Sequence, residues 1–290
     1  MKKILISLVV VLAGFSAQAE DFGSTLLEQA SGKFSEFTAG LIPGEGHTEV
    51  SIDLREEVSP DFSILAVREI APRDDGNIFT QFSLHNTEAQ TGDGGDERFI
   101  GNLGLGTRKL LNDNTLMIGI NNFYDYDLQN EHTRASLGLE ARSAVLEFYL
   151  NRYAKLSDDY NAENVLDGWD YSLSSQIPYL HWATAFISGY EWEGVTRGDI
   201  EGTKIGSELV LTPNLNFEVA YDDKKGNDNE WYSKFQFIHP GKEGPTLLDG
   251  ASNMPWKENR DMSSELLSKV KRHNKIMIEF KGAATISRTD

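Results

Sequence analysis

His132 and Ser136 are the two residues of this sequence whose types and spacing come closest to a catalytic pair. On a strand, side chains an even number of positions apart share one face, and a histidine beside a serine hydroxyl can activate it for ester hydrolysis. Some β-barrel phospholipases work in this way, with an asparagine that orients the histidine. No asparagine is clearly placed for that role here, so we interpret both residues as polar side chains of the fold and expect no enzyme.

Two acidic runs could supply oxygen ligands to calcium. They are residues 92–97, which read Gly-Asp-Gly-Gly-Asp-Glu, and Asp158-Asp159. Hard cations prefer carboxylate and carbonyl oxygens, but solvated loops are equally rich in Asp and Gly. We therefore interpret both runs as loops and expect no metal and no cofactor. Such loops could still bridge through divalent cations to lipopolysaccharide.

The overall composition excludes several classes of function. The chain has 45 acidic and 27 basic residues and a net charge of −18, which argues against nucleic acid as a partner. It has no cysteine, so disulfide and thiolate chemistry are excluded. It also contains no nucleophile-elbow, phosphate-loop, zinc-protease or dinucleotide-binding motif.

The first part of the chain has the layout of a secretory signal peptide. Lys2 and Lys3 precede an apolar run at residues 4–15, and the small-residue sequence Ala17-Gln18-Ala19 follows. We expect a signal peptide at residues 1–19 and a periplasmic N-terminal segment at residues 20–46. The mature chain is therefore expected to be exported.

Apolar and polar residues alternate from residue 47 to residue 239. In residues 215–222, for example, Leu215, Phe217, Val219 and Tyr221 oppose Asn216, Glu218, Ala220 and Asp222. This period is typical of strands with one apolar and one polar face. Twelve such segments begin near residues 47, 62, 77, 97, 115, 132, 144, 167, 182, 203, 214 and 229.

Several of these segments are about ten residues long, the length of a tilted strand that crosses a membrane. Short connections near residues 72–76, 111–114 and 178–180 alternate with longer ones such as 87–96 and 155–166. That alternation is typical of outer-membrane barrels, with short turns in the periplasm. The sequence therefore predicts an all-β fold, a twelve-stranded antiparallel transmembrane β-barrel at residues 47–239, in the outer membrane of a Gram-negative bacterium.

Aromatic residues gather at the strand ends beside the long loops. They are Tyr124, Tyr126, Trp169, Tyr171, Tyr190, Trp192, Tyr221 and Trp231. We interpret them as an interfacial girdle on the lipid-facing side. The last strand ends in spaced aromatics that include Phe235 and Phe237, and it resembles the terminal signal that the outer-membrane assembly machinery reads.

One stretch carries a specific family resemblance. It reads Asn122-Phe123-Tyr124-Asp125-Tyr126-Asp127, followed by His132 and Arg134. After the barrel segments come Arg272, Asn274, Ile276, Ile278, Glu279 and Phe280. In this order, over about residues 45–281, the chain resembles the transmembrane β-domain of intimin and invasin, the inverse autotransporters, and their linker. The resemblance implies a barrel whose linker leads out through the pore and carries adhesive domains at the surface.

Residues 240–290 are expected to form a periplasmic connection, a helix and a pore-threading tail. Met262, Leu266, Leu267 and Val270 would share one face of a short post-barrel helix at residues 261–272. Residues 273–281 would span about 30 Å when extended, enough to thread the lumen. Gly104, Gly106, Gly119, Gly138 and Gly206 would leave room for the inserted backbone. Alternatively, the tail lies in the periplasm as a loose helix.

Three functions are compared on this basis. The leading one is a barrel that translocates or anchors its C-terminal tail at the surface, related to adhesion and invasion proteins but without a passenger, since nine residues follow Lys281. Its partners would be membrane lipid and lipopolysaccharide, the assembly machinery and a host or cell-surface receptor. The second is a small-solute channel lined by Glu140, Arg142, Glu147, Glu208, Glu218 and Lys234. The third is a barrel lipase.

Overall fold

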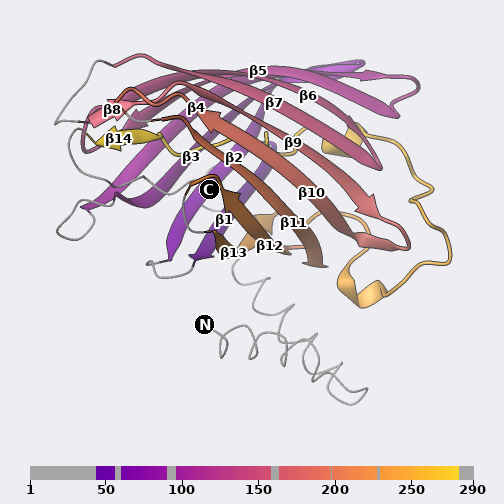
Figure 1. Cartoon of the computed structure of the whole chain (residues 1–290). Helices are drawn as coiled ribbons and strands as arrows, with labels where there is room; N and C mark the ends of the chain where they lie inside the picture. Colours follow the sequence, from indigo (N-terminus) through magenta and orange to yellow (C-terminus); the bar gives the residue numbers. More distant parts are fainter. Residues whose placement is uncertain are drawn as a thin grey trace.

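Twelve strands of the described residues close into one antiparallel β-barrel (Figure 1). The computed structural model describes residues 44–55, 60–89, 96–157, 163–196, 198–226 and 229–280. The expected signal peptide at residues 1–19 and segment up to residue 43 lie outside these ranges, as do Asp158 and Asp159 and residues 92–95.

The barrel strands are β1 (Gly46–Arg55), β2 (Asp61–Arg73), β3 (Gly76–Ala89), β4 (Asp96–Leu111), β5 (Leu116–Asp127), β6 (Thr133–Ser143), β7 (Leu146–Lys155), β9 (Gly168–Ile177), β10 (Leu180–Trp192), β11 (Ile200–Thr212), β12 (Leu215–Lys224) and β13 (Glu230–His239). Each begins within three residues of the position expected from the alternation. β1 pairs with β13 and closes the ring. The predicted all-β, twelve-stranded barrel is confirmed.

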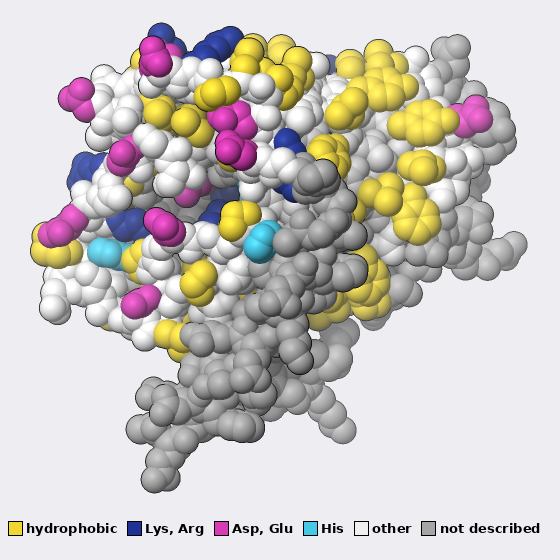
Figure 2. All heavy atoms as spheres, turned by 180° about the vertical axis from the view of Figure 1, so that it is seen from behind, with side chains coloured by type: hydrophobic (Ala, Val, Ile, Leu, Met, Phe, Trp, Pro, Cys, Tyr) yellow, Lys and Arg dark blue, Asp and Glu magenta, His cyan; other side chains and the backbone are white. Residues whose placement is uncertain are grey.

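The two faces of each strand differ in chemistry because side chains alternate across the pleat. On β5, Tyr124 and Tyr126 are exposed on the outside, while Phe123 and Asp125 are buried in the lumen. Leu103, Leu137 and Ile205 on other strands are also more than half exposed, on the outer face that contacts lipid in a membrane barrel. Figure 2 shows hydrophobic side chains along the outer wall and charged side chains around a hollow at one end of the barrel.

The predicted aromatic girdle is only partly present. Tyr124, Tyr126 and Trp231 are exposed on the outer face, with exposed fractions of 37–47%. Tyr190 and Trp192 instead point into the lumen, where Trp192 is fully buried and packs against Tyr153. Their assignment to the girdle was wrong, because the even-numbered side chains of this part of β10, which include Phe186 and Ser188, point into the lumen.

The barrel has a short-turn end and a long-loop end. At the short-turn end, strands are joined by two to four residues, as in residues 74–75 and 112–115. Asn112, Asp113 and Asn114 all adopt left-handed backbone, with φ between 53° and 63°, which Asn and Asp tolerate better than other residues. At the long-loop end, the connection between β7 and β9 contains the short strand β8 (Glu163–Val165).

None of the described residues forms a helix long and apolar enough to cross a bilayer. After β13, the chain makes one 3-10 turn, η1 (Leu247–Asp249), and another, η2 (Ser263–Glu265). The described residues end in strand β14 (Ile278–Phe280), which pairs with β8 (Figure 1). The α-helix expected at residues 261–272 is therefore wrong in extent, since only the η2 turn is helical.

The barrel itself explains the missing helix. A helix needs its own carbonyls and amides for hydrogen bonds four residues apart. Here the carbonyls of Leu266 and Ser268 accept hydrogen bonds from Arg108, at 2.8 and 2.6 Å, and the amide of Val270 donates to Gln81 at 2.8 Å. Lumen side chains thus bind backbone groups that an α-helix would use, and the helical conformation does not continue beyond a short turn.

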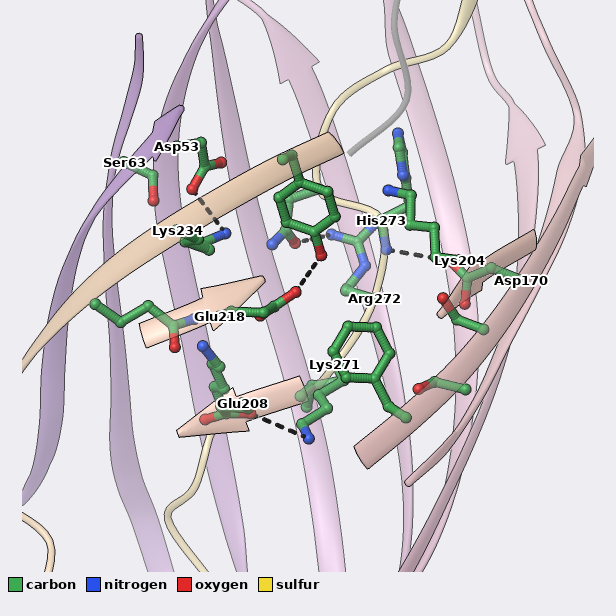
Figure 3. Close-up of a pocket in the computed structure, with 18 of the residues that line it drawn as sticks. Asp53, Ser63, Asp170, Lys204, Glu208, Glu218, Lys234, Lys271, Arg272 and His273 are labelled. Carbon is green, nitrogen blue, oxygen red and sulfur yellow. Dashed lines mark hydrogen bonds and ion pairs between the residues drawn. The ribbon is translucent and has the colours of Figure 1, made fainter. Parts of the chain in front are cut away.

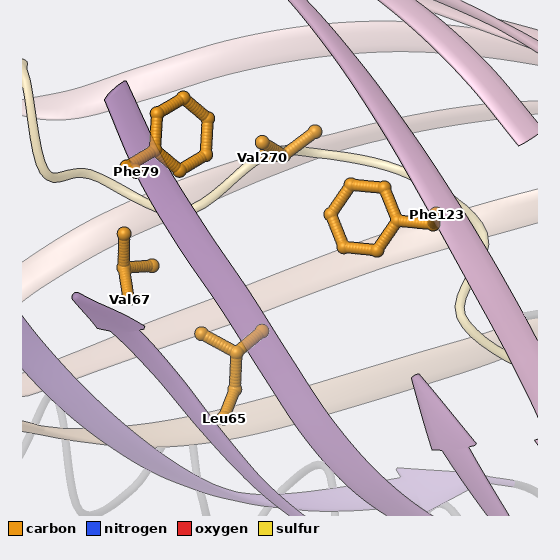
Figure 4. Close-up of a cluster of buried hydrophobic side chains, with 5 residues drawn as sticks. All are labelled: Leu65, Val67, Phe79, Phe123 and Val270. Atoms are coloured by element: carbon orange, nitrogen blue, oxygen red, sulfur yellow. The ribbon is translucent and has the colours of Figure 1, made fainter. Parts of the chain in front are cut away.

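The lumen glycines make room for barrel side chains rather than for the inserted backbone. A Cβ on Gly104 would lie 2.2 Å from the ring of Phe123, and one on Gly106 would lie 2.4 Å from the ring of Phe79. Those two rings form a buried cluster with Val270, Leu65 and Val67 (Figure 4). The expectation that glycine would directly face the inserted chain is corrected: glycine lets the rings lie flat, and the rings contact the chain.

Candidate functional site

The linker, residues 261–280, runs through the whole lumen. At the short-turn end the amide of Met262 donates to the carbonyl of Asn114 at 2.8 Å. Midway, Asn151 of β7 donates to the carbonyl of Lys271 at 3.1 Å. At the long-loop end, Ile278 pairs with Val165 of β8. Contacts at both ends and in the middle place this segment inside the barrel from one mouth to the other.

Every lysine and arginine in the described part of the linker forms an ion pair with a barrel carboxylate. The pairs are Lys269–Glu49 at 2.8 Å, Lys271–Glu147 at 3.1 Å, Lys271–Glu208 at 3.6 Å, Arg272–Asp125 at 2.6 Å and Lys275–Asp61 at 2.6 Å. Figure 3 shows the Lys271–Glu208 pair beside Arg272 and His273. Buried charges need such partners, so the lumen wall is complementary to a basic chain in an acidic protein.

Asp125 is the centre of this arrangement. Its carboxylate accepts hydrogen bonds from Arg272 of the linker, at 2.6 and 2.9 Å, and from Arg134 of β6 at 2.9 Å. All three side chains are fully buried. The guanidinium of Arg272 lies 4.3 Å from the centre of the Phe123 ring, and that of Arg134 lies 4.3 Å from the Tyr153 ring. Aromatic faces thus replace part of the hydration that both cations lose.

The barrel also binds the linker's main chain. Arg134 donates to the carbonyl of His273 at 2.8 Å, and Asn102 donates to the carbonyl of Asn274 at 2.9 Å. The amide of His273 donates to the hydroxyl of Tyr153 at 2.7 Å. These contacts do not depend on the linker's side chains, and they satisfy backbone groups that a buried extended segment would otherwise leave unpaired.

At the long-loop end, the linker is held by a small sheet and a polar cluster. Ile276 and Ile278 pack with Ile100 and Val165, and the Glu279 carboxylate accepts hydrogen bonds from the backbone amides of the loop at residues 195–196. The β8 side of this sheet is fixed by Glu163.

Glu163 joins β8 to the barrel wall. Its carboxylate binds Arg98 of β4 and lies 2.7 Å from Nε2 of His132. Burial alone would raise the pKa of Glu163, but hydrogen bonds from His132 and Arg98 outweigh it and lower the pKa to about 2. The carboxylate is therefore charged at neutral pH.

The residues of the predicted motif divide between the two faces. Phe123, Asp125, Asp127 and Arg134 point into the lumen, together with His132 at the strand end, whereas Asn122, Tyr124 and Tyr126 are exposed outside. The Asp127 carboxylate accepts hydrogen bonds from the backbone amides of Gln129 and Asn130 and so stabilises the turn that follows β5.

The structure brings the motif and the predicted linker residues together. Arg272 binds Asp125, and Asn274 lies beside it, with its side-chain oxygen 3.2 Å from Arg272. Ile276, Ile278, Glu279 and Phe280 all lie at the β8–β14 sheet.

Other functional residues were not predicted. The ion pairs also use four residues for which no such role was predicted: Glu49, Asp61, Lys269 and Lys275. The basic run from Lys269 to Lys275, in a chain with a net charge of −18, could have indicated the two lysines, whereas nothing in the sequence marks Glu49 and Asp61 as their partners.

His132 and Ser136 do not form a lipase centre on the outer face. His132 is fully buried against Glu163, and Ser136 lies on the inward parity of β6 with Arg134. Among the described residues no group of three His, Asp or Glu side chains could hold a metal ion.

A cavity of about 200 Å³ remains beside the linker. It is lined by β1–β3, by β9–β13 and by linker residues 269–274, so the linker leaves the lumen only partly filled (Figure 3). Lys204, Glu218 and Lys234 face it, which makes it a polar space suited to water rather than to an apolar ligand.

Comparisons with known proteins agree with this geometry. Residues 17–274 match the family model of the inverse autotransporter β-domain. The inverse autotransporter adhesin YeeJ of Escherichia coli K12 is 26% identical over 223 residues, which cover 71% of this chain and 9% of YeeJ. Intimin of Escherichia coli O127:H6 is 24% identical over 211 residues, which cover 64% of this chain and 21% of intimin. The chain thus spans far less than two thirds of either relative.

A solved structure also has this fold. A membrane protein from work on in-meso crystallization superimposes with a TM-score of 0.65 at 20% identity, covering 81% of this chain and 100% of that chain. At this identity the similarity establishes the shared fold of the barrel.

Proposed function

Because this chain belongs to the inverse autotransporter β-domain family and lies in the outer membrane of a Gram-negative bacterium, we propose that it carries its own linker across that membrane and anchors it there. In this proposal the short-turn end faces the periplasm and the long-loop end faces the exterior, as in other outer-membrane barrels. The role is mechanical and needs no catalytic residue.

The set of linker ion pairs is the observation that supports anchoring most directly. The four linker cations bind carboxylates that come from β1, β2, β5, β7 and β11, so the contacts surround the chain. Moving the linker by one residue shifts it by about 3.3 Å and turns each side chain to the opposite side. Such a shift would break all these pairs together, and each unpaired buried charge is costly. The linker therefore has one favoured register.

Epitope tags on intact cells test the proposal. A tag after Asp290 should be labelled by antibody on intact cells, because the linker leaves the barrel at the long-loop end. A tag at Asn253, in the connection at the short-turn end, is the matched control and should be labelled only after the outer membrane is permeabilised. Labelling of the Asp290 tag only after permeabilisation would refute the proposed path.

The names of the relatives support a role in attachment. One is an adhesin and another is intimin, and both are much longer than the region that matches this chain. We infer that the linker presents a surface segment that binds a host or cell-surface receptor. Attachment of bacteria expressing the chain, compared with cells expressing a variant that ends at Arg260, tests this inference.

A small-solute channel is the second candidate, and the cavity beside the linker favours it. Because the linker fills much of the lumen, conductance in a planar bilayer should be low in the whole chain. It should rise strongly when residues 261–290 are removed. High conductance with the linker in place would make transport the primary function.

A further inference from the structure

The segment that joins the barrel to the linker contains a stretch with little charge. We call residues 246–256, Thr-Leu-Leu-Asp-Gly-Ala-Ser-Asn-Met-Pro-Trp, the strap. Asp249 is its one charged residue, in a chain of which 25% is charged. The Asp249 carboxylate bonds back to the amide and hydroxyl of Thr246, at 2.6 and 3.0 Å. The carboxylate of the strap's only charged residue therefore forms these hydrogen bonds within the strap.

The strap is fastened to the turn between β9 and β10. The amide of Tyr179 donates to Pro255 at 3.0 Å, and the carbonyl of Tyr179 accepts from Ser252 at 2.7 Å. Tyr179 has a φ of 67°, a strained conformation for a residue with a side chain, and this conformation lets both its backbone groups reach the strap. The indole of Trp182 also donates to the carbonyl of Gly250 at 2.7 Å. The strap therefore has a defined position.

The strap continues the lipid-facing surface of the barrel. Leu247 packs with a cluster that contains Leu211, Leu215 and Phe217, on the outward side of β11 and β12. The inward side of the same strands carries Glu208 and Glu218, which line the lumen cavity. Leu247 is thus outside the barrel wall, although the linker that follows the strap enters the lumen.

Large apolar side chains on and next to the strap remain uncovered. Leu248 is 54% exposed, Met254 is 50% exposed and Tyr179 is 51% exposed. They lie with Trp182 at the level where the strands end. Tyr and Trp are enriched at this level in membrane proteins, because one end of the side chain is apolar and the other can bind water or headgroups.

We propose that the strap is a membrane-interface segment that binds phospholipid at the short-turn end of the barrel. Leu248 and Met254 enter the boundary between headgroups and acyl chains, and the strap's backbone stays bonded to the β9–β10 turn. The lipid holds the strap against the outer wall and so fixes the point at which the linker turns into the lumen. Assignment to the periplasmic leaflet rests on the proposed function, whereas contact with lipid does not.

Single-cysteine labelling tests this proposal, since the chain has no native cysteine. Leu248→Cys and Met254→Cys, each in the full chain, carry a polarity-sensitive nitrobenzoxadiazole dye in vesicles of phosphatidylethanolamine and phosphatidylglycerol. Leu137→Cys on the lipid-facing side of β6 is the lipid control. Asp74→Cys, in an exposed turn at the same end of the barrel, is the water control.

We expect blue-shifted emission for both strap labels, with loss of emission in vesicles of brominated phospholipid and little loss with iodide. Strap labels that behave like the Asp74 label would overturn the proposal. So would a blue shift that brominated lipid leaves unquenched and that disappears when protein is diluted in lipid, because this shows a second copy of the chain on the strap. The vesicle assay reads lipid contact in either orientation, so its outcome is separate from that of the epitope tags.

Discussion

Replacing Asp125 with asparagine should destabilise the folded protein more than any other single removal of a carboxylate in the lumen. The substitution keeps the size of the side chain but removes the charge that two fully buried guanidinium groups share, at 2.6 Å from Arg272 and 2.8 Å from Arg134. Removing one partner of a buried pair costs about 3–5 kcal/mol. Because the adjacent cavity admits water, we expect the lower part of that range, about 3 kcal/mol.

The free energy of unfolding is measured by urea titration of the chain in vesicles, with tryptophan fluorescence as the signal. Asp75→Asn is the matched control, since Asp75 pairs with Lys109 at 3.1 Å and both are more than half exposed. Its expected cost is below about 1 kcal/mol.

A double variant tests whether the cost of losing Asp125 comes from the cations that it leaves without a partner. Adding Arg272→Gln to Asp125→Asn removes one of the two cations left without a partner, so the double variant should be no less stable than Asp125→Asn alone. Equal costs for Asp125→Asn and Asp75→Asn, or additive costs for Asp125→Asn and Arg272→Gln, would refute the central role of this pair.

Three further outcomes are expected. Gly104→Ala should reduce the yield of folded barrel, seen as loss of the heat-modifiable band on gels, because its Cβ would lie 2.2 Å from the Phe123 ring, whereas Gly198→Ala, with nothing within 4 Å, should fold normally. Because the pKa of Glu163 is lowered to about 2 in the folded protein, its contribution to the β8–β14 sheet is full above its usual value near 4.5 and is lost as the pH falls toward 2. Hydrogen exchange of the β14 amides, corrected for intrinsic rates, should show this loss in the native chain but not in Glu163→Gln. Deleting Phe235 and Phe237 from β13 should abolish membrane assembly, and normal insertion would show that they are ordinary lipid-facing residues.

The barrel could be predicted because its signal is local. Each strand has its own alternation, as in Phe217 and Val219 against Glu218 and Ala220. A barrel wall with one face toward lipid and the other toward the lumen requires this pattern in every strand. Position at a strand end did not assign Tyr190 and Trp192 correctly, because the regular alternation of β10 from Thr184 to Trp192 turns both side chains into the lumen.

The linker could be located but its conformation could not. Met262, Leu266, Leu267 and Val270 have helical spacing, and in isolation that spacing favours a helix. In the barrel, Val270 packs in the lumen with Phe79 and Phe123, while Arg108 and Gln81 bind the backbone. Binding partners more than a hundred residues away override a local preference of a few tenths of a kcal/mol per residue.

The amino-acid sequence by itself determined the class of fold and the strands, because those depend on repeating patterns within about ten residues, but it left two positions open for the segment after the barrel. Only the tertiary structure decided that Asp125 is shared by Arg134 and Arg272, that Glu49 and Asp61 bind linker lysines, and that the strap lies outside the wall. Partner choice between distant charges depends on distances that ring closure sets, and a carboxylate carries no local mark of the cation it will meet.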